Sequence, residues 1–242
     1  MTAPTPTILA TSGGYRPGSR TRLEFDALVH YAVELAGVSG RNPRVTYVGT
    51  AGGDQAGRIA DMHGAAHLAG YRLSTLQLFT MPNLADIEGH LAEQDVIWVD
   101  GGSVANLLAV WRVHGLAEVF ERVWQSGVVL AGISAGSLCW FAGGTTDSFG
   151  PQLQPVTNGL ALLPFGNGVH YDSEPGRRPL VHQLVAAGTL PQTYCTDDGA
   201  GLVFSGTRLT EVVAERDGAA GYLVRRSSEG VVEQRLDTRR LR

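Results

Sequence analysis

Short apolar runs alternate with longer amphipathic stretches over the first 140 residues of the chain. Five runs have the length and the Val, Ile and Leu content of buried strands: 7–11, 44–49, 71–78, 95–100 and 127–133. Three intervening stretches have the periodicity of helices: 20–37, 56–70 and 103–125. Strands that alternate with helices predict an α/β fold, with a mainly parallel central sheet flanked by helices on both faces.

Two of the predicted helices carry further detail. One apolar face of the stretch 20–37 is formed by Phe25, Leu28, Val29, Ala32 and Leu35. The stretch 103–125 contains Gly115, where we expect the helix to break. Because ligands of such sheets bind beyond the carboxyl ends of the strands, functional residues are expected there.

The second half of the chain has a different pattern. Residues 143–175 are rich in Gly, Pro, Asn and Thr, and so long an irregular stretch is typical of a functional segment. A helix is predicted over 178–187, with Pro179 in its first turn. Strand-like pieces then form a C-terminal β-rich segment: 192–197, 200–206, 209–215, 221–226 and 230–237. Since neither an internal repeat nor a clear linker interrupts the chain, residues 1–242 are predicted to form a single domain.

Composition and charge narrow the function classes. A net charge of −4 gives no basic surface that would favour nucleic acid. No apolar run approaches the roughly 20 residues of a membrane span, and the first residues lack the pattern of a signal peptide, so we expect a cytoplasmic protein. The two cysteines, Cys139 and Cys195, are interpreted as buried free thiols. All 19 basic residues are arginine, which excludes chemistry that needs a lysine, such as Schiff-base formation.

The stretch Gly132-Ile133-Ser134-Ala135-Gly136 carries the clearest candidate chemistry. It fits the pattern G-x-S-x-G, in which a serine is held at a tight turn between a buried strand and a helix. Small neighbours let the backbone double back, so that the serine hydroxyl is exposed above the edge of the sheet. The backbone N–H of Ala135 would then face the oxyanion of a reacting carbonyl. We therefore interpret Ser134 as a nucleophile.

A serine nucleophile needs a base, and the seven histidines are the candidates. His170 follows the nucleophile in the irregular stretch, among small residues that would leave room for a substrate, and is the predicted base. His63 and His67 share a helix face, but Gly64 occupies the position where a zinc peptidase helix carries its glutamate, so no metal site is predicted there. The remaining histidines are interpreted as packing or surface residues: His30 and His114 in predicted helices, His90 in a polar connection, and His182 in the predicted helix 178–187.

A carboxylate should orient the imidazole and stabilise its charged form. The candidates are Asp147, Asp172, Asp197 and Asp198. No histidine follows His182, so the chain order serine, histidine, acid fits better than the order with a late histidine. Asp198, next to a glycine at a predicted strand end, is favoured, and Asp197 remains the alternative.

Four segments together resemble the peptidase E family of aspartyl dipeptidases, serine peptidase family S51. They are "VDGGSVANLL", "GISAGS", "LPFGNGVHYD" and "TDDGAG", and the resemblance extends to about residue 205. It implies a parallel sheet flanked by helices, distantly similar to class I glutamine amidotransferases, and cytoplasmic serine peptidase activity. It also implies that Ser134 is the nucleophile, His170 the base and Asp198 the acid, although the family often has a glutamate at the acid position.

The resemblance extends to groups that would contact the substrate. Gly101 and Gly102 match the Gly-Gly-Asn turn of the family, in which the second glycine contributes an oxyanion N–H, while Ser103 replaces the asparagine. The family uses an arginine after the catalytic histidine to bind a substrate carboxylate, and Arg177 and Arg178 lie at about that place. A second interpretation is that both arginines are solvated charges before a helix. Asp147 matches a segment near the family's site and is given a supporting role.

The expected function is therefore hydrolysis of short peptides, favouring dipeptides with an N-terminal aspartate. The alternatives are carboxypeptidase-type cleavage, hydrolysis of other small amides or esters, and a homologue that binds a ligand without catalysis. Neither a metal nor an organic cofactor is expected, and the expected partner is a short peptide rather than nucleic acid or a membrane. The sequence leaves open whether the chain forms a homodimer.

Overall fold

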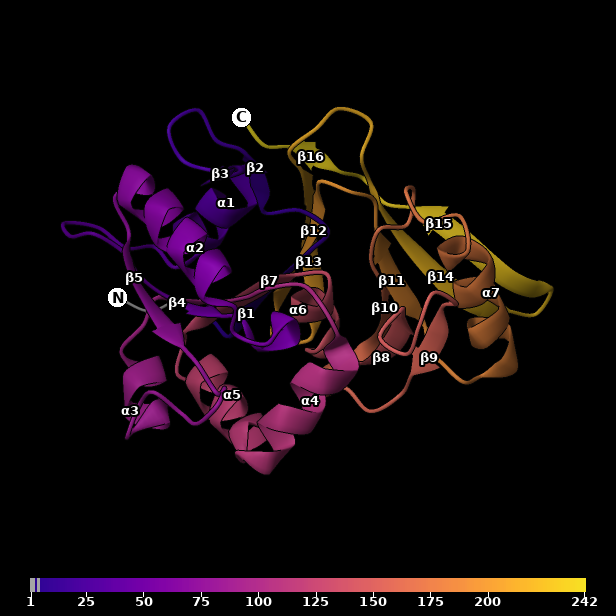
Figure 1. The fold of residues 1–242 in the computed structure, drawn as a ribbon. Coiled ribbons are helices and arrows are strands. Elements are labelled where there is room, and N and C mark those ends of the chain that lie inside the picture. The colour runs from indigo at the N-terminus through magenta and orange to yellow at the C-terminus, as the bar shows by residue number, and fades with distance from the viewer. Residues whose placement is uncertain (1–2, 4) are drawn as a thin grey trace.

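A large twisted sheet of eight strands forms one half of the molecule (Figure 1). The computed structural model describes residue 3 and residues 5–242. The strand order is β16-β13-β12-β1-β7-β6-β4-β5, and the five strands from β1 to β5 in that order run parallel. The strands are β1 (Thr7–Thr11), β4 (Arg44–Val48), β5 (Arg72–Leu76), β6 (Val96–Val99), β7 (Val129–Ile133), β12 (Ala200–Ser205), β13 (Arg208–Ala214) and β16 (Arg239–Arg240).

Helices cover both faces of this sheet, each face with its own apolar cluster (Figure 1). Alternate residues of one strand point to opposite faces, so that Leu9 joins one cluster and Ile8 the other. The first cluster includes α1 (Ala27–Leu35) and α2 (Ala56–Ala69); the second includes α4 (Val104–Val113) and α5 (Leu116–Gln125), with α3 (Ile87–Ala92) packed beside α5. The expected α/β fold with a large central sheet is confirmed.

A second sheet of six strands forms the other half of the molecule (Figure 1). Its order is β15-β14-β11-β10-β8-β9, with β8, β10 and β11 parallel to one another. The strands are β8 (Phe141–Thr146), β9 (Gln154–Val156), β10 (Leu163–Gly168), β11 (Thr193–Thr196), β14 (Gly221–Ser227) and β15 (Gly230–Arg235). Helix α7 (Arg177–Ala187) packs on this sheet, and α6 (Ala135–Leu138) follows β7.

Three expectations about local structure need correction. Residues 143–175 are not irregular throughout, because β9, β10 and most of β8 lie within them. Phe25 does not lie on a helix: it ends the short strand β3 (Leu23–Phe25), which pairs with β2 (Tyr15–Pro17), and Asp26 caps the following helix. His90 lies in α3 rather than in a connection. The expected break at Gly115 is confirmed, since Gly115 has φ 63° between α4 and α5.

Asp26 is a buried carboxylate at the start of α1. Its Oδ1 accepts hydrogen bonds from the N–H groups of Leu28 (2.8 Å) and Val29 (3.3 Å), while Oδ2 has no partner among residues 3 and 5–242. Burial, and next the nearby charge of Glu215, raise the pKa of Asp26 to about 7. An unfolded chain would hold this pKa near 4. The folded state therefore binds the proton of Asp26 more tightly than the unfolded state does. The free energy of unfolding consequently decreases as the pH rises from about 4 to about 7.

We expect Asp26→Asn to stabilise the protein at pH 8 by up to about 4 kcal/mol and to have little effect at pH 4. Asparagine keeps the oxygen that caps the helix but carries no charge to bury. Urea unfolding of both proteins at the two pH values measures the difference in the free energy of unfolding. A difference that does not change with pH would contradict the argument.

None of the helices in the described part of the chain is long and apolar enough to cross a membrane.

Candidate active site

Ser134 lies in a strained turn between β7 and α6. Its backbone has φ 57° and ψ −113°, a conformation that non-glycine residues rarely adopt and that recurs at functional sites. The glycines on either side permit the turn: a Cβ on Gly132 would lie 2.5 Å from the carbonyl oxygen of Gly136, and one on Gly136 would lie 2.1 Å from that of Val99. The small residues of the motif thus allow the chain to reverse tightly, which leaves the serine half-buried at the edge of the sheet.

His170 and Asp198 follow two adjacent parallel strands of the second sheet. His170 lies two residues beyond β10, and Asp198 lies two residues beyond β11. The histidine Nδ1 and the aspartate Oδ1 are 2.5 Å apart. The aspartate itself is held by a hydrogen bond from its backbone N–H to Oδ1 of Asp172 (2.8 Å). The parallel register of the two strands therefore brings a histidine and a carboxylate into contact from positions 28 residues apart.

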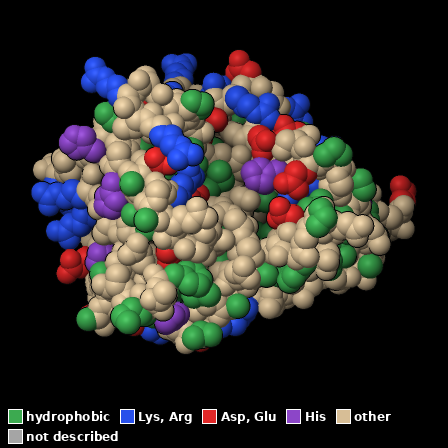
Figure 2. All heavy atoms as spheres, in the orientation of Figure 1, with side chains coloured by type: hydrophobic (Ala, Val, Ile, Leu, Met, Phe, Trp, Pro, Cys, Tyr) green, Lys and Arg blue, Asp and Glu red, His purple; other side chains and the backbone are tan. Residues whose placement is uncertain are grey.

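The end of β1 links the histidine to the serine. The backbone N–H of Ser134 donates to the carbonyl oxygen of Thr11 (3.0 Å), because β1 and β7 are neighbouring parallel strands. The next residue, Ser12, accepts a hydrogen bond at its Oγ from the backbone N–H of His170 (3.0 Å). The segment Thr11-Ser12 thus contacts both Ser134 and His170. The site lies where the carboxyl ends of parallel strands from the two sheets meet. Figure 2 shows a hollow in this region, with a histidine and several acidic side chains at its edge.

Asp197, the alternative acid, does not contact the imidazole. Its Oδ2 accepts hydrogen bonds from the backbone N–H of Ala220 and the hydroxyl of Tyr222, both at 3.0 Å. The side chain is buried, and this burial raises the pKa of Asp197 above its usual range. Of the two neighbouring aspartates, Asp198 is the one paired with His170.

The glycine turn after β6 lies beside the serine. A Cβ on Gly101 would lie 3.3 Å from the Cβ of Ser134. Gly102 has φ 136°, and a Cβ there would lie 2.4 Å from the carbonyl oxygen of Ala51, so only glycine fits. The N–H groups of Gly102 and Ala135 have no hydrogen-bond partner among residues 3 and 5–242. Two unpaired donors near a serine hydroxyl are what an oxyanion site requires.

Ser103 has a structural contact in this turn. It caps α4, with its Oγ accepting a hydrogen bond from the N–H of Asn106 (3.2 Å). The hydroxyl therefore fixes the start of the helix that follows the glycine turn.

The two arginines of α7 are engaged within the protein. Arg177 is 2% exposed, and its guanidinium donates to Glu174 and to the backbone and side-chain oxygens of Thr145. Arg178 donates to Glu233 (2.8 Å) and lies over the ring of Tyr171. Both guanidiniums thus have a carboxylate partner within the protein, and a role of either arginine in binding a substrate carboxylate stays a prediction.

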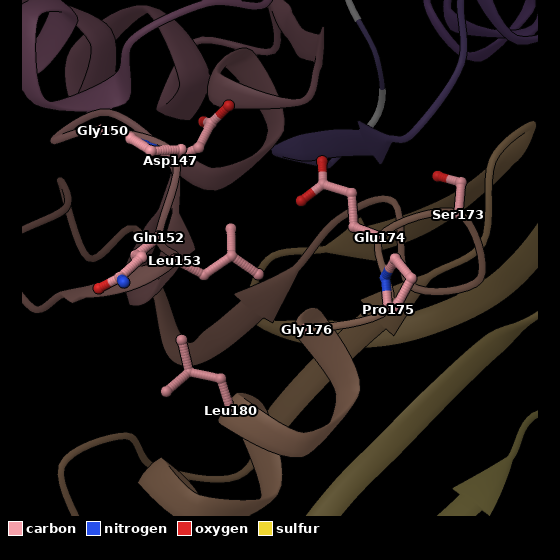
Figure 3. A pocket seen from close by; sticks show the side chains of 10 residues that line it. Asp147, Gly150, Gln152, Leu153, Ser173, Glu174, Pro175, Gly176 and Leu180 are labelled. Carbon is pink, nitrogen blue, oxygen red and sulfur yellow. The ribbon is translucent and has the colours of Figure 1, made fainter.

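Asp147 lies at a second cavity, of about 780 Å³, between the loop after β8 and the loop before α7. Figure 3 shows its side chain on one side of this cavity and Glu174 on the other. It has no side-chain hydrogen bond to Ser134, His170 or Asp198 in the described part of the chain. Asp147 therefore makes no direct hydrogen bond to the three candidate catalytic residues, and its supporting role stays a prediction.

The two histidines that share a helix face, His63 and His67, lie on α2. His63 faces the hydroxyl of Thr75 (3.3 Å). Within residues 3 and 5–242, no three His, Cys, Asp or Glu side chains are grouped so that they could hold a metal ion.

Sequence reasoning missed Ser12, Asp100 and Arg58. Ser12 follows the first strand directly, and Asp100 precedes the glycine turn, so their positions at strand ends were the available signal. Arg58 carries no such signal, because it lies within α2, in its first turn, rather than at a strand end.

Comparison with known proteins identifies the family. The model of peptidase family S51 matches residues 8–212, which is most of the chain. The chain belongs to peptidase family S51. The uncharacterized peptidase YgaJ of Bacillus subtilis (strain 168) is 39% identical to this S51 peptidase over 191 residues, which are 79% of this chain and 82% of that protein.

Two solved structures share the fold of this S51 peptidase. A peptidase from an acI-B1 Actinobacterium superimposes with a TM-score of 0.67 at 20% identity, over 97% of this chain and 95% of that one. A candidate peptidase E protein from Listeria monocytogenes EGD-e gives a TM-score of 0.59 at 18% identity, over 96% and 98% of the two chains. At these identities the similarity shows the fold alone.

Proposed function

We propose that the chain is a serine exopeptidase that hydrolyses short peptides, with preference for dipeptides that begin with aspartate. Membership of peptidase family S51 supports hydrolysis of a peptide bond. The observation that carries the mechanism is the 2.5 Å contact of His170 with Asp198. Hydrogen bonds to the adjacent residues Thr11 and Ser12 connect the strained turn of Ser134 to His170.

The proposed reaction begins with attack of Ser134 Oγ on the scissile carbonyl carbon. Nε2 of His170 takes the hydroxyl proton, while Nδ1–H remains bonded to Asp198, which stabilises the imidazolium. The N–H groups of Gly102 and Ala135 stabilise the negative oxygen of the tetrahedral intermediate. The imidazolium then gives its proton to the leaving amine, and water releases the acyl group by the reverse sequence.

A panel of peptides tests the proposal. It contains Asp-Leu, Asn-Leu, Ala-Leu, the tripeptide Ala-Ala-Leu, Ala-Leu amide and a nitrophenyl ester. We expect Asp-Leu to be cleaved with the highest kcat/KM, as measured by mass spectrometry of the released amino acids. Preferred cleavage of the ester or of the longer peptide would favour one of the other hydrolase activities. A complete lack of hydrolysis across the panel would contradict the proposed function.

A further inference from the structure

A cavity of about 410 Å³ opens beside the turn that carries the nucleophile. Two of its lining residues, Gly101 and Ile133, belong to the segments that hold Ser134, so a group bound in the cavity would lie next to the serine. The wall is completed by Tyr15, Tyr47, Gly49, Gly52, Gln55, Arg58 and Asp100. Arg58 and Asp100 are the two charged side chains of this wall.

Asp100 has no lone pair left for a ligand. Its Oδ1 accepts hydrogen bonds from the hydroxyl of Tyr15 (3.1 Å), from Nη2 of Arg58 (3.3 Å) and from the N–H of Gly101 (2.9 Å). Its Oδ2 accepts from the hydroxyl of Tyr47 (2.6 Å) and from Nε of Arg58 (2.8 Å). A carboxylate offers about four acceptor positions, so these donors saturate it.

Arg58, by contrast, has guanidinium N–H groups that remain available to a ligand. Its contacts with Asp100 use Nε and one hydrogen of Nη2, while Nη1 has no partner among residues 3 and 5–242. The side chain is 32% exposed, and its position is fixed by the ion pair and by the ring of Tyr15, whose centroid lies 4.3 Å from Cζ. Burial opposes the charge, but the hydrogen bond and the charge of Asp100 raise the pKa of Arg58, so the guanidinium stays cationic.

We propose that Arg58 binds a carboxylate of the peptide substrate in this cavity and thereby determines specificity. Because the unpaired N–H groups of a fixed guanidinium require an acceptor, a planar carboxylate fits them better than a neutral group. Arg177, Arg178 and Arg58 each have a carboxylate partner within the protein, but of these three only Arg58 lines the cavity next to the nucleophile. The inference rests on the proposed function, since it concerns the substrate of the same site.

The carboxylate has two sources in a short peptide: an aspartate side chain at the N-terminal residue, or the free C-terminus. Asp-Leu against Asn-Leu varies the first, and Ala-Leu against Ala-Leu amide varies the second. Figure 2 shows arginine side chains on the side of the hollow opposite the histidine, where either carboxylate could lie while the peptide bond faces the serine.

The test compares kcat/KM ratios for the two substrate pairs in the wild type and in Arg58→Gln. We expect one pair to be discriminated by about 10- to 100-fold in the wild type, and this ratio to fall close to 1 in the variant. The pair whose ratio falls identifies the source of the carboxylate. Arg58→Lys should restore part of the ratio, because it keeps the charge without the planar fork.

Two controls separate recognition from a structural effect. Arg122 forms a similar two-point ion pair with Glu88 on α3, so Arg122→Gln should leave both ratios unchanged. The double variant Arg58→Gln with Asp100→Asn avoids an unpaired carboxylate and keeps an acceptor for the N–H of Gly101. It should lose discrimination as the single variant does, whereas ratios that persist in both variants would overturn the proposal.

A binding measurement separates this inference from the proposed function. Calorimetry on Ser134→Ala should detect tighter binding of the carboxylate member of the discriminated pair, and Arg58→Gln in that background should abolish the difference. If the wild type hydrolyses no peptide but this binding difference appears, the function fails and the role of Arg58 stands. If hydrolysis occurs and the wild type discriminates neither pair, the role of Arg58 fails alone.

Discussion

Ser134→Ala should lower kcat/KM for the best dipeptide by about 10³- to 10⁶-fold. Alanine keeps the Cβ but removes the hydroxyl, so no acyl-enzyme can form, and the oxyanion donors alone sustain only a small residual rate. The strained backbone suits alanine as well as serine, because both have a Cβ at the same φ of 57°. Initial rates of product release, with thermal unfolding to confirm the fold, measure the effect.

Ser137→Ala is the matched control for this substitution. Ser137 lies three residues later, is fully buried, and donates its hydroxyl to Oδ1 of Asn167 (3.0 Å) rather than facing the site. Its loss should cost about 1 kcal/mol of stability and reduce activity far less. If Ser134→Ala retains kcat/KM within tenfold of the wild type, serine catalysis at this position is excluded.

The turn that carries Ser134 could be predicted because residues next to the serine in the sequence determine its geometry. A Cβ on Gly132 would lie 2.5 Å from the carbonyl oxygen of Gly136, so this need for glycine arises within five consecutive residues. The contact of His170 with Asp198 depends instead on the pairing of β10 with β11, which lie 25 residues or more apart. Sequence reasoning expected these two residues to meet from their chain order and from family resemblance, without access to that register.

The prediction that residues 143–175 are irregular was wrong for a physical reason. Glycine normally weakens a strand, and "GGTT" (143–146) and "LPFGNG" (163–168) were included in the stretch interpreted as irregular. In the structure, a Cβ on Gly144 would lie 2.1 Å from the carbonyl oxygen of Asn167, and one on Gly166 would lie 2.2 Å from Oγ1 of Thr193. These glycines permit close contact within the second sheet, which a pattern of single residues does not reveal.

The cavity residues were unpredictable for a different reason. Arg58 meets Asp100 across 42 residues of sequence, and each looks like an ordinary surface charge when considered alone. Arg177 shows the reverse case: two arginines ahead of a predicted helix appear solvated, yet this one is 2% exposed. Where a charged side chain points depends on the tertiary packing around it, so substrate recognition is the part of the site that the sequence defines least.

Asp198→Asn should lower kcat by about 10²- to 10⁴-fold while KM changes little. The carboxylate accepts the Nδ1–H of His170, which keeps Nε2 free to take the serine proton; an asparagine amide can donate to Nδ1 and so stabilise the unreactive tautomer. We favour the lower part of this range because Asp198 is 42% exposed, and water can partly replace it.

Asp197→Asn is the control that distinguishes the two neighbouring aspartates. Asp197 bonds to Ala220 and Tyr222 instead of the imidazole, so its loss should change the free energy of unfolding more than kcat. Steady-state kinetics and urea unfolding of both variants separate these effects. If Asp197→Asn lowers kcat by more than Asp198→Asn does, the acid has been assigned to the wrong residue. The 2.5 Å contact would then be a feature of the resting enzyme alone, since only a rearrangement on substrate binding could bring Asp197 to the ring.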